Sequence, residues 1–223
     1  YFDKVNIHAV VNLAGAGIAD HRWTSSYKKK LKESRIKVTK TIVEAINKRI
    51  ISPKVLISAS AIGYYPPGES LHVETERSAS NFLAEICSDW EIEAKKVKDT
   101  RLVIFRIGVV LSNKGGAFEK IAKPVKLGIG APLGSGNQLI SWVHIDDLVN
   151  MIFFAIGKNN FHGVFNAVAP ERTTNKELTK LMASEYKKPL WLPNVPSFVL
   201  KLMLGEISSQ VLNSFNISSE KIE

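Results

Sequence analysis

Three groups of small and hydroxyl-bearing residues stand directly after short apolar runs. The groups are N-L-A-G at residues 12–15, S-A-S at residues 58–60 with Tyr64 and Tyr65 close behind, and R-I-G-V-V at residues 106–110. Small residues let a backbone approach a flat ligand, while hydroxyls and amides supply hydrogen bonds. Together the groups predict a site for a flat ligand. The alternative for each is that small residues merely permit a tight turn.

The glycines after the first apolar run do not form a phosphate-binding loop. Such a loop reads G-x-x-G-x-x-G between a strand and a helix, so that backbone N–H groups hold a pyrophosphate. Residues 14–17 read A-G-A-G, lack a third glycine at that spacing, and are followed by His21, Arg22 and Trp23. A helix does not start there.

The other ionisable residues favour structural roles. Glu76 is interpreted as a carboxylate that orders its loop, and His144, Asp146 and Asp147 as the start of a helix, where caps and acidic side chains are stabilising. No set of His, Cys, Asp and Glu has the spacing of metal ligands, so no metal is expected.

Apolar runs of two lengths alternate along the chain and must position these groups. Strands are predicted at residues 8–13, 54–58, 101–107 and 163–168, and helices at residues 24–47, at 80–96 and from Asp146 onward. Continuous β-branched strands separated by helices indicate a doubly wound α/β fold with a parallel sheet covered on both faces. Because ligands bind beyond the carboxyl ends of such strands, the three groups share one edge.

Composition excludes several classes of protein. The 223 residues are 45% hydrophobic, enough for a core, and no apolar run is long enough to span a membrane. The lone Cys87 excludes a disulfide framework and reads as a buried small hydrophobe. The net charge of +9 would permit nucleic-acid binding, yet no basic–aromatic interleaving accompanies it, so neither a nucleic-acid nor a membrane partner is expected. Residues 28–32 read as a solvated lysine face, and the default location is the cytoplasm.

Several motifs in order resemble one family. They are N-L-A-G at 12–15, R-W at 22–23, S-R at 34–35, S-A-S-A-I-G-Y-Y at 58–65, W-E at 90–91, R-I-G-V-V-L at 106–111, G-A-P-L-G-S-G-N-Q at 130–138, S-W-V-H-I-D-D-L at 141–148 and N-A-V-A-P at 166–170. This set resembles the atypical extended short-chain dehydrogenase/reductases, the NAD(P)-dependent epimerase/dehydratase-like or sugar-nucleotide-epimerase-like proteins. Residues 193–206 resemble the C-terminal domain of unknown function that these proteins carry.

The resemblance implies a Rossmann-type domain over residues 1–169 and a mostly helical substrate cap over residues 170–223, with residues 113–140 contributing to the cap. It makes N-L-A-G the turn after the family's fourth strand. The glycine fingerprint would then lie upstream, so the chain is expected to begin inside the domain, with an incomplete cap and with organelle targeting left open.

The resemblance also implies NADP(H) as cofactor, with NAD less favoured; the family and the basic charge carry this preference. Arg35 is a candidate for holding a pyrophosphate or substrate anion, because a guanidinium binds such groups bidentately. The alternative is a surface or interface arginine. The cofactor-side candidates are Asn12, Leu13, Ala14, Gly15, Lys30, Arg35, Ser58, Arg106 and Val110.

Hydride transfer in this superfamily uses a serine, a tyrosine and a lysine in Y-x-x-x-K. Ser60 matches the serine, but Leu83 and Cys87 stand where the tyrosine and lysine belong. Tyr64 and Tyr65 are the nearest substitute proton donors; the alternative is that they only cover the nicotinamide pocket.

Two functions therefore stay open. One is an NADP(H)-dependent oxidoreductase or epimerase acting on an unknown hydroxyl or carbonyl substrate, with a nucleotide sugar as one candidate. The other is a non-catalytic NAD(P)-binding regulatory or scaffold protein, which the missing Y-x-x-x-K motivates. Analogy with extended relatives adds a homodimer formed through the two long helices over residues 24–47 and 80–96.

Overall fold

A four-stranded parallel sheet lies at the centre of the computed structural model, which describes residues 7–223. Its order is β1-β2-β4-β8, and its strands are β1 (Ala9–Asn12), β2 (Val55–Ala61), β4 (Arg101–Ile107) and β8 (Gly163–Ala167). The pairing of β2 with β4 is continuous, from Val55 opposite Arg101 to Ala61 opposite Ile107. The predicted parallel sheet is therefore confirmed.

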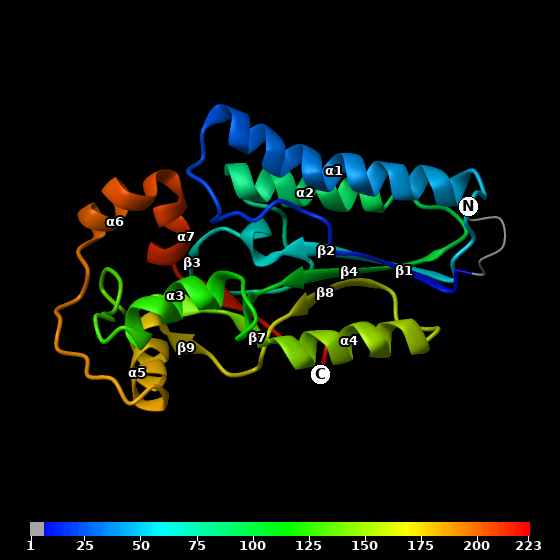
Figure 1. Ribbon diagram of the computed structural model, residues 1–223. Coiled ribbons are helices and arrows are strands. Elements are labelled where there is room, and N and C mark those ends of the chain that lie inside the picture. The colour runs from blue at the N-terminus through cyan, green and yellow to red at the C-terminus, as the bar shows by residue number, and fades with distance from the viewer. Residues whose placement is uncertain (1–6) are drawn as a thin grey trace.

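Helices cover both faces of this sheet, as Figure 1 shows. Helices α1 (Ser25–Asn47) and α2 (Phe82–Ala94) lie on one face, and α4 (Ile145–Gly157) lies on the other. Each begins at a side-chain cap: Thr24 accepts from Tyr27 N, Asn81 from Leu83 N and Ala84 N, and His144 from Asp146 N. These caps satisfy backbone donors that the first helical turn leaves free. The predicted doubly wound α/β class is confirmed.

The core follows the two-residue period of the strands. Val55 and Ile57 of β2 join Phe105 of β4 in a cluster that packs against α4, whereas Leu56, between them in sequence, packs with Val43 of α1 on the opposite face. Because the sheet is buried on both faces, its strands read as continuous apolar runs.

The remaining elements gather at the carboxyl ends of the strands, on the left of Figure 1. Two helices, α3 (Ala117–Lys126) and α5 (Asn175–Glu185), share a cluster that contains Ala122, Val125, Leu178 and Met182. The other elements are η1 (Ile62–Tyr64), β3 (Gly68–His72), β5 (Val109–Leu111), β6 (Leu139–Ile140), β7 (Trp142–His144), β9 (Thr173–Thr174), α6 (Ser197–Leu204), η2 (Gly205–Ile207), α7 (Ser208–Leu212) and β10 (Phe215–Ile217).

Three short sheets connect these elements: β3 with β10, β5 with β7, and β6 with β9. Within residues 7–223, no helix combines the length and the apolar character that crossing a bilayer requires.

One boundary differs from the sequence prediction in a way that affects the site. Strand β2 runs to Ala61, three residues past the predicted end at Ser58, because its ladder with β4 continues to Ile107. Ser60, expected in the loop after the strand, therefore lies within the strand.

Candidate functional site

The turn after β1 is shaped by Asn12 and exposes the residues that follow. The Asn12 side chain is buried; its Nδ2 donates to Thr39 Oγ1 at 2.8 Å, and its Oδ1 accepts from Ala14 N at 3.2 Å. The next side chain, Leu13, is 55% exposed. Asn12 therefore holds the turn, while Leu13, Ala14 and Gly15 form its accessible part.

Arg35 fastens this turn to α1 and does not extend toward an open cleft. Its Nη1 donates to Leu31 O and its Nη2 to Ala16 O, both at 2.9 Å. A Cβ on Gly15 would lie 2.9 Å from Arg35 Cζ, so glycine makes room for the guanidinium. Burial lowers the pKa of Arg35. Arg35 thus holds the loop, and its expected role in binding an anion stays a prediction. Lys30, exposed one turn earlier, has its Nζ 5.9 Å from the Tyr27 ring centre.

The two serines of β2 point into the protein. Ser58, a predicted cofactor contact, is 1% exposed and its hydroxyl donates to Ala59 O, so its role toward a cofactor stays a prediction. Ser60 is 3% exposed, and its Oγ donates to Glu91 Oε1 at 2.9 Å. Glu91 thus fixes the hydroxyl that the sequence suggested for polarising a substrate oxygen.

Arg106, a predicted cofactor contact, forms a buried ion pair with Glu91, and its role toward a cofactor stays a prediction. Its Nε donates to Glu91 Oε1 at 2.7 Å and its Nη2 to Glu91 Oε2 at 3.0 Å, the bidentate geometry of a strong pair. Its Nη1 donates to Tyr65 Oη and to Glu74 O. Burial alone would lower the pKa of Arg106, but the hydrogen bonds and charge of Glu91 raise it. The guanidinium is committed to the core.

Tyr65 belongs to the same network, and its expected role as a proton donor stays a prediction. Its ring is fully buried, its Oη accepts from Arg106 and donates to Asn166 Oδ1 at 2.7 Å, and burial raises its pKa to about 12. The phenol is thus protonated near neutral pH and directed into the core of the structure. Asn166 in turn donates to Ser218 O, so the network joins β2, β4 and β8 to the C-terminal segment.

Tyr64 is the phenol that stays partly accessible. Its ring lies 3.5 Å from Arg106 Cζ, a cation–π contact, and 5.4 Å edge-on to the Tyr65 ring. On the next strand end, Val110 packs against the core between the sheet and α4. A Cβ on Gly108 would lie 2.6 Å from Ser141 O, so this glycine serves packing and not the approach of a ligand.

The residues at the family's tyrosine and lysine positions are buried in α2. Leu83 is 7% exposed, and Cys87, 4% exposed, is the buried hydrophobe that the sequence predicts. Burial raises the pKa of Cys87 to about 11. Neither supplies a proton donor or a fixed positive charge.

The interpretations of Glu76 and His144 agree with the structure. Glu76 Oε1 accepts from Val73 N at 3.0 Å and its Oε2 lies 2.6 Å from His72 Nδ1, so the carboxylate orders its loop. Although burial opposes this, the hydrogen bond with His72 lowers the pKa of Glu76. His144 caps α4. Within residues 7–223, no group of three His, Cys, Asp or Glu side chains could hold a metal ion.

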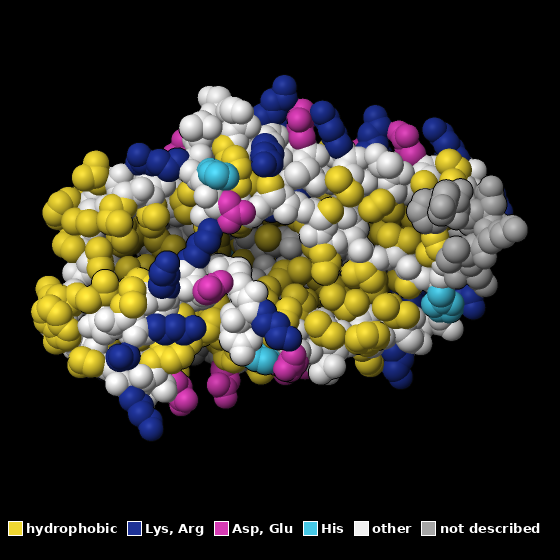
Figure 2. All heavy atoms as spheres, viewed as in Figure 1, with side chains coloured by type: hydrophobic (Ala, Val, Ile, Leu, Met, Phe, Trp, Pro, Cys, Tyr) yellow, Lys and Arg dark blue, Asp and Glu magenta, His cyan; other side chains and the backbone are white. Residues whose placement is uncertain are grey.

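A loop at residues 16–23 crosses from the β1 turn to the helices at the strand ends. Asp20 Oδ1 and Ala19 O both accept from Lys120 Nζ of α3, at 2.8 and 2.7 Å. Arg22 Nη2 donates to Leu202 O of α6 at 2.8 Å. Figure 2 shows a recess between the α1 side and the α3 side of this face, with hydrophobic side chains in it.

A second cleft separates the start of α2 from α6, η2 and α7. Its walls include Trp23, Gly63, Phe82, Gln210 and Phe215. Gly63 belongs to η1, directly after β2, so this cleft adjoins the strand ends.

Sequence reasoning did not assign a role to Glu91, the residue that organises the buried network. Its partners lie 15 and 31 positions away, and their proximity depends on the packing of α2 on the sheet. The available signal was a carboxylate among the apolar residues of α2, because a buried charge requires a partner.

Comparisons with known proteins agree on one family. Residues 1–167 match the family model described as NAD dependent epimerase/dehydratase family. An Arabidopsis thaliana protein named epimerase family protein SDR39U1 homolog, chloroplastic, is 44% identical over 208 residues, covering 92% of this chain and 59% of its own length. An epimerase family protein of Staphylococcus haemolyticus is 40% identical over 225 residues, covering 98% of this chain and 74% of its own length.

Among solved structures, the human epimerase family protein SDR39U1 with NADPH superposes with a TM-score of 0.91 at 31% identity. The match covers 96% of this chain and 74% of the human chain. This chain thus spans 59% of the Arabidopsis relative and about three quarters of the other two.

Proposed function

Because the chain belongs to the NAD dependent epimerase/dehydratase family, we propose that it binds NADP(H) at the carboxyl ends of its strands and transfers hydride to or from a hydroxyl or carbonyl substrate. The observation that carries this proposal is the accessible turn after β1 in a chain whose fold matches the NADPH-bound human protein at a TM-score of 0.91. NADP(H) is favoured over NAD because that 31% identical relative was solved with NADPH.

The residues after β1 suit the nicotinamide end of such a cofactor. Leu13 offers an exposed apolar side chain, and Ala14 and Gly15 leave their backbone open to a flat ring. No G-x-x-G-x-x-G pattern occurs in residues 1–223, so the usual pyrophosphate-binding groups are not among them. When bound, the nicotinamide supplies or accepts the hydride.

The residues of this chain would then handle the proton. Tyr64 is the candidate donor because it is the partly accessible phenol of η1, directly after β2, and Arg106 Cζ lies 3.5 Å from the centre of its ring. Ser60 would not contact the substrate. Its hydroxyl is bonded to Glu91, so Ser60 would help to position the end of β2.

A second candidate function is supported by the burial of the positions that normally carry catalysis. Leu83 and Cys87 replace the tyrosine and lysine, and Tyr65 is locked in the core. A protein that binds NADP(H) without turnover, as a regulatory or scaffold protein, would need none of these groups.

The first test is a calorimetric titration of the full-length natural protein with NADPH and, in parallel, with NADH. We expect NADPH to bind at least about tenfold more tightly than NADH. If folded protein binds neither dinucleotide, both candidate functions are overturned.

The second test separates the two candidates with Tyr64→Phe, and Tyr186→Phe serves as a control remote from β2. NADPH oxidation is measured with a panel of carbonyl compounds. For an enzyme, we expect Tyr64→Phe to keep NADPH affinity and lose about 10²-fold or more in rate, the usual contribution of a positioned acid. An unchanged rate in Tyr64→Phe excludes this phenol, and absence of turnover in the natural protein favours the non-catalytic candidate.

Three further expectations stay predictions. We propose that residues 170–223 with 113–140 form the substrate cap, supported by the packing of α3 on α5. We propose a homodimer, and a cytoplasmic location; the Arabidopsis relative is named as chloroplastic. Gel filtration with light scattering would test the dimer.

A further inference from the structure

The cleft between α2 and the α6–α7 segment is large enough for a small substrate. Its volume is about 540 Å³, and it opens beside Gly63, three residues after Ser60. Gly63 precedes Tyr64 in η1, so a ligand in this cleft would lie beside the residue before the candidate proton donor.

The walls of the cleft carry several aromatic rings. The Trp23 and Phe82 rings meet edge to face with centres 5.5 Å apart, and Phe215 of β10 adds a third ring. Trp23 Nε1 donates to Ile18 O at 2.8 Å, which fixes the indole in place. Preorganised rings favour the flat or ring-shaped part of a ligand.

The start of α2, which forms one wall, is closed to a phosphate group. A helix N-terminus binds anions through its free backbone N–H groups. Here Asn81 Oδ1 accepts from both Leu83 N and Ala84 N at 3.1 Å, so these donors are already used. Glu85 adds a carboxylate to the same turn, which repels an anion.

The cations near the cleft are largely engaged by the protein itself. Lys28 Nζ pairs with Glu206 Oε2 at 2.6 Å, and Arg22 Nη2 donates to Leu202 O. Lys32 bridges Glu85 and Asp89 at 2.9 and 2.8 Å. Lys201 is the one cation that lines the cleft, and within residues 7–223 it makes no ion pair. A nucleoside diphosphate carries at least two negative charges and calls for more than one exposed lysine.

Apart from Lys201 and Glu206, whose carboxylate is paired with Lys28, the polar side chains that line the cleft are uncharged. Ser209, Gln210 and Asn213 come from α7 and its end, and Asn81 from the start of α2. Hydroxyl and amide groups pair with neutral hydroxyl and carbonyl oxygens.

We propose that this cleft takes a neutral, ring-shaped alcohol or carbonyl compound and not a nucleoside diphosphate sugar. This substrate class rests on the proposed function, since it places the substrate beside the strand end that would hold the nicotinamide. Of the substrates that the sequence analysis left open, this proposal excludes the nucleotide sugar.

The experiment measures binding to the full-length natural protein by calorimetry, with and without saturating NADPH. The probes are a set of neutral cyclic ketones and alcohols that includes 1-tetralone, compared with UDP-glucose and UDP. We expect at least one neutral probe to bind at least about tenfold more tightly than either nucleotide. Tighter binding of UDP-glucose, or no binding of any neutral probe, overturns the proposal.

A variant that fills the cleft ties the binding to this place. Ser209→Phe inserts a ring among the lining residues, and Ser184→Phe, on the exposed face of α5, is the matched control. We expect Ser209→Phe to lose neutral-probe binding by at least about tenfold while Ser184→Phe keeps it. If both variants bind the neutral probe equally well, the proposal that the probe lies in this cleft is overturned. NADPH titrated into the same samples separates this failure from failure of the proposed function, because the cofactor would still bind.

Discussion

Arg106 and Glu91 are an ion pair that solvent hardly reaches, since they are 2% and 2% exposed. The desolvation of such a pair is offset only while both partners and their hydrogen bonds are intact. Here Ser60, Tyr65 and Glu74 complete the set of partners. The network therefore fixes the end of β2, which leads directly into η1 and the candidate proton donor Tyr64.

Removing one partner of this pair should be costly. We expect Arg106→Met to lower the free energy of unfolding by about 3–5 kcal/mol, because Glu91 is left charged and buried. Urea unfolding followed by circular dichroism measures the loss. Arg49→Met is the control: its partner Asp99 is 3.7 Å away and both side chains are more than 80% exposed, so a change within about 0.5 kcal/mol is expected. Equal losses in the two variants would contradict the buried network.

Tyr65 should make stability depend on pH in the alkaline range. Burial raises its pKa from 10.0 to about 12, so the folded protein keeps a proton that the unfolded chain has released. Its stabilising effect is full below about pH 10 and is lost as the pH rises toward 12. Urea unfolding of the natural protein and of Tyr65→Phe should give a stability difference that narrows over this window. Tyr186→Phe keeps Tyr65 and should keep the dependence; a constant difference for Tyr65→Phe would refute the assignment.

At the scale of elements, the join between β4 and β5 depends on a glycine. A Cβ on Gly108 would lie 2.6 Å from Ser141 O and 2.9 Å from Val168 Cγ1. Because one of these atoms belongs to the backbone of a neighbouring segment, it cannot move aside cheaply.

We expect Gly108→Ala to destabilise the protein by about 1–3 kcal/mol, the usual cost of overpacking a closed site. Chemical denaturation with a fluorescence readout measures this change. The control is Gly68→Ala in β3, where no atom lies within 4 Å of the added methyl. The packing argument fails if Gly108→Ala is as stable as Gly68→Ala.

The elements themselves were largely predictable from sequence because their signals are local. Continuous β-branched runs marked the strands, and the helix starts predicted at residues 24 and 80 lie within two residues of the starts of α1 at Ser25 and α2 at Phe82. The network at the strand end was not predictable, because Tyr65 and Asn166 meet across 101 residues. Sequence also could not show that β2 continues past Ser58 and turns Ser60 inward.

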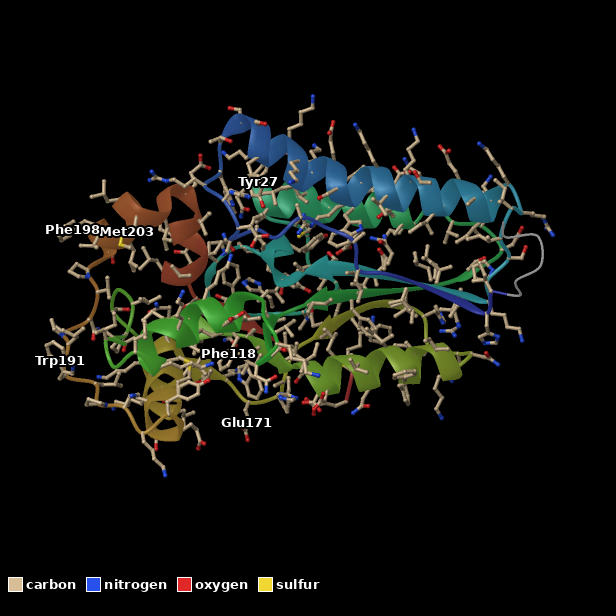
Figure 3. The ribbon with its side chains drawn as sticks, viewed as in Figure 1. Tyr27, Phe118, Glu171, Trp191, Phe198 and Met203 are labelled. Atoms are coloured by element: carbon tan, nitrogen blue, oxygen red, sulfur yellow. The ribbon has the colours of Figure 1, made fainter. Side chains whose placement is uncertain are left out.

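At the scale of the whole molecule, the net charge of +9 does not form one basic stripe on α1. Lys37 pairs with Glu33 at 2.9 Å, and Lys40 and Lys48 both approach Glu44. Mixed charges of this kind suit a solvated face. Exposed apolar side chains gather instead on α6 and the segment before it, where Figure 3 locates Phe198, Met203 and Trp191.

The loop at residues 16–23 has a thermodynamic consequence for the whole protein. It starts at the accessible β1 turn, grips α3 through Asp20 and α6 through Arg22, and contributes Trp23 to the second cleft. A ligand that displaces this loop at the β1 turn must also disturb the contacts that the loop makes with α3 and α6. For any two ligands whose binding is coupled through this loop, the factor by which one alters the affinity for the other equals the factor in the reverse direction.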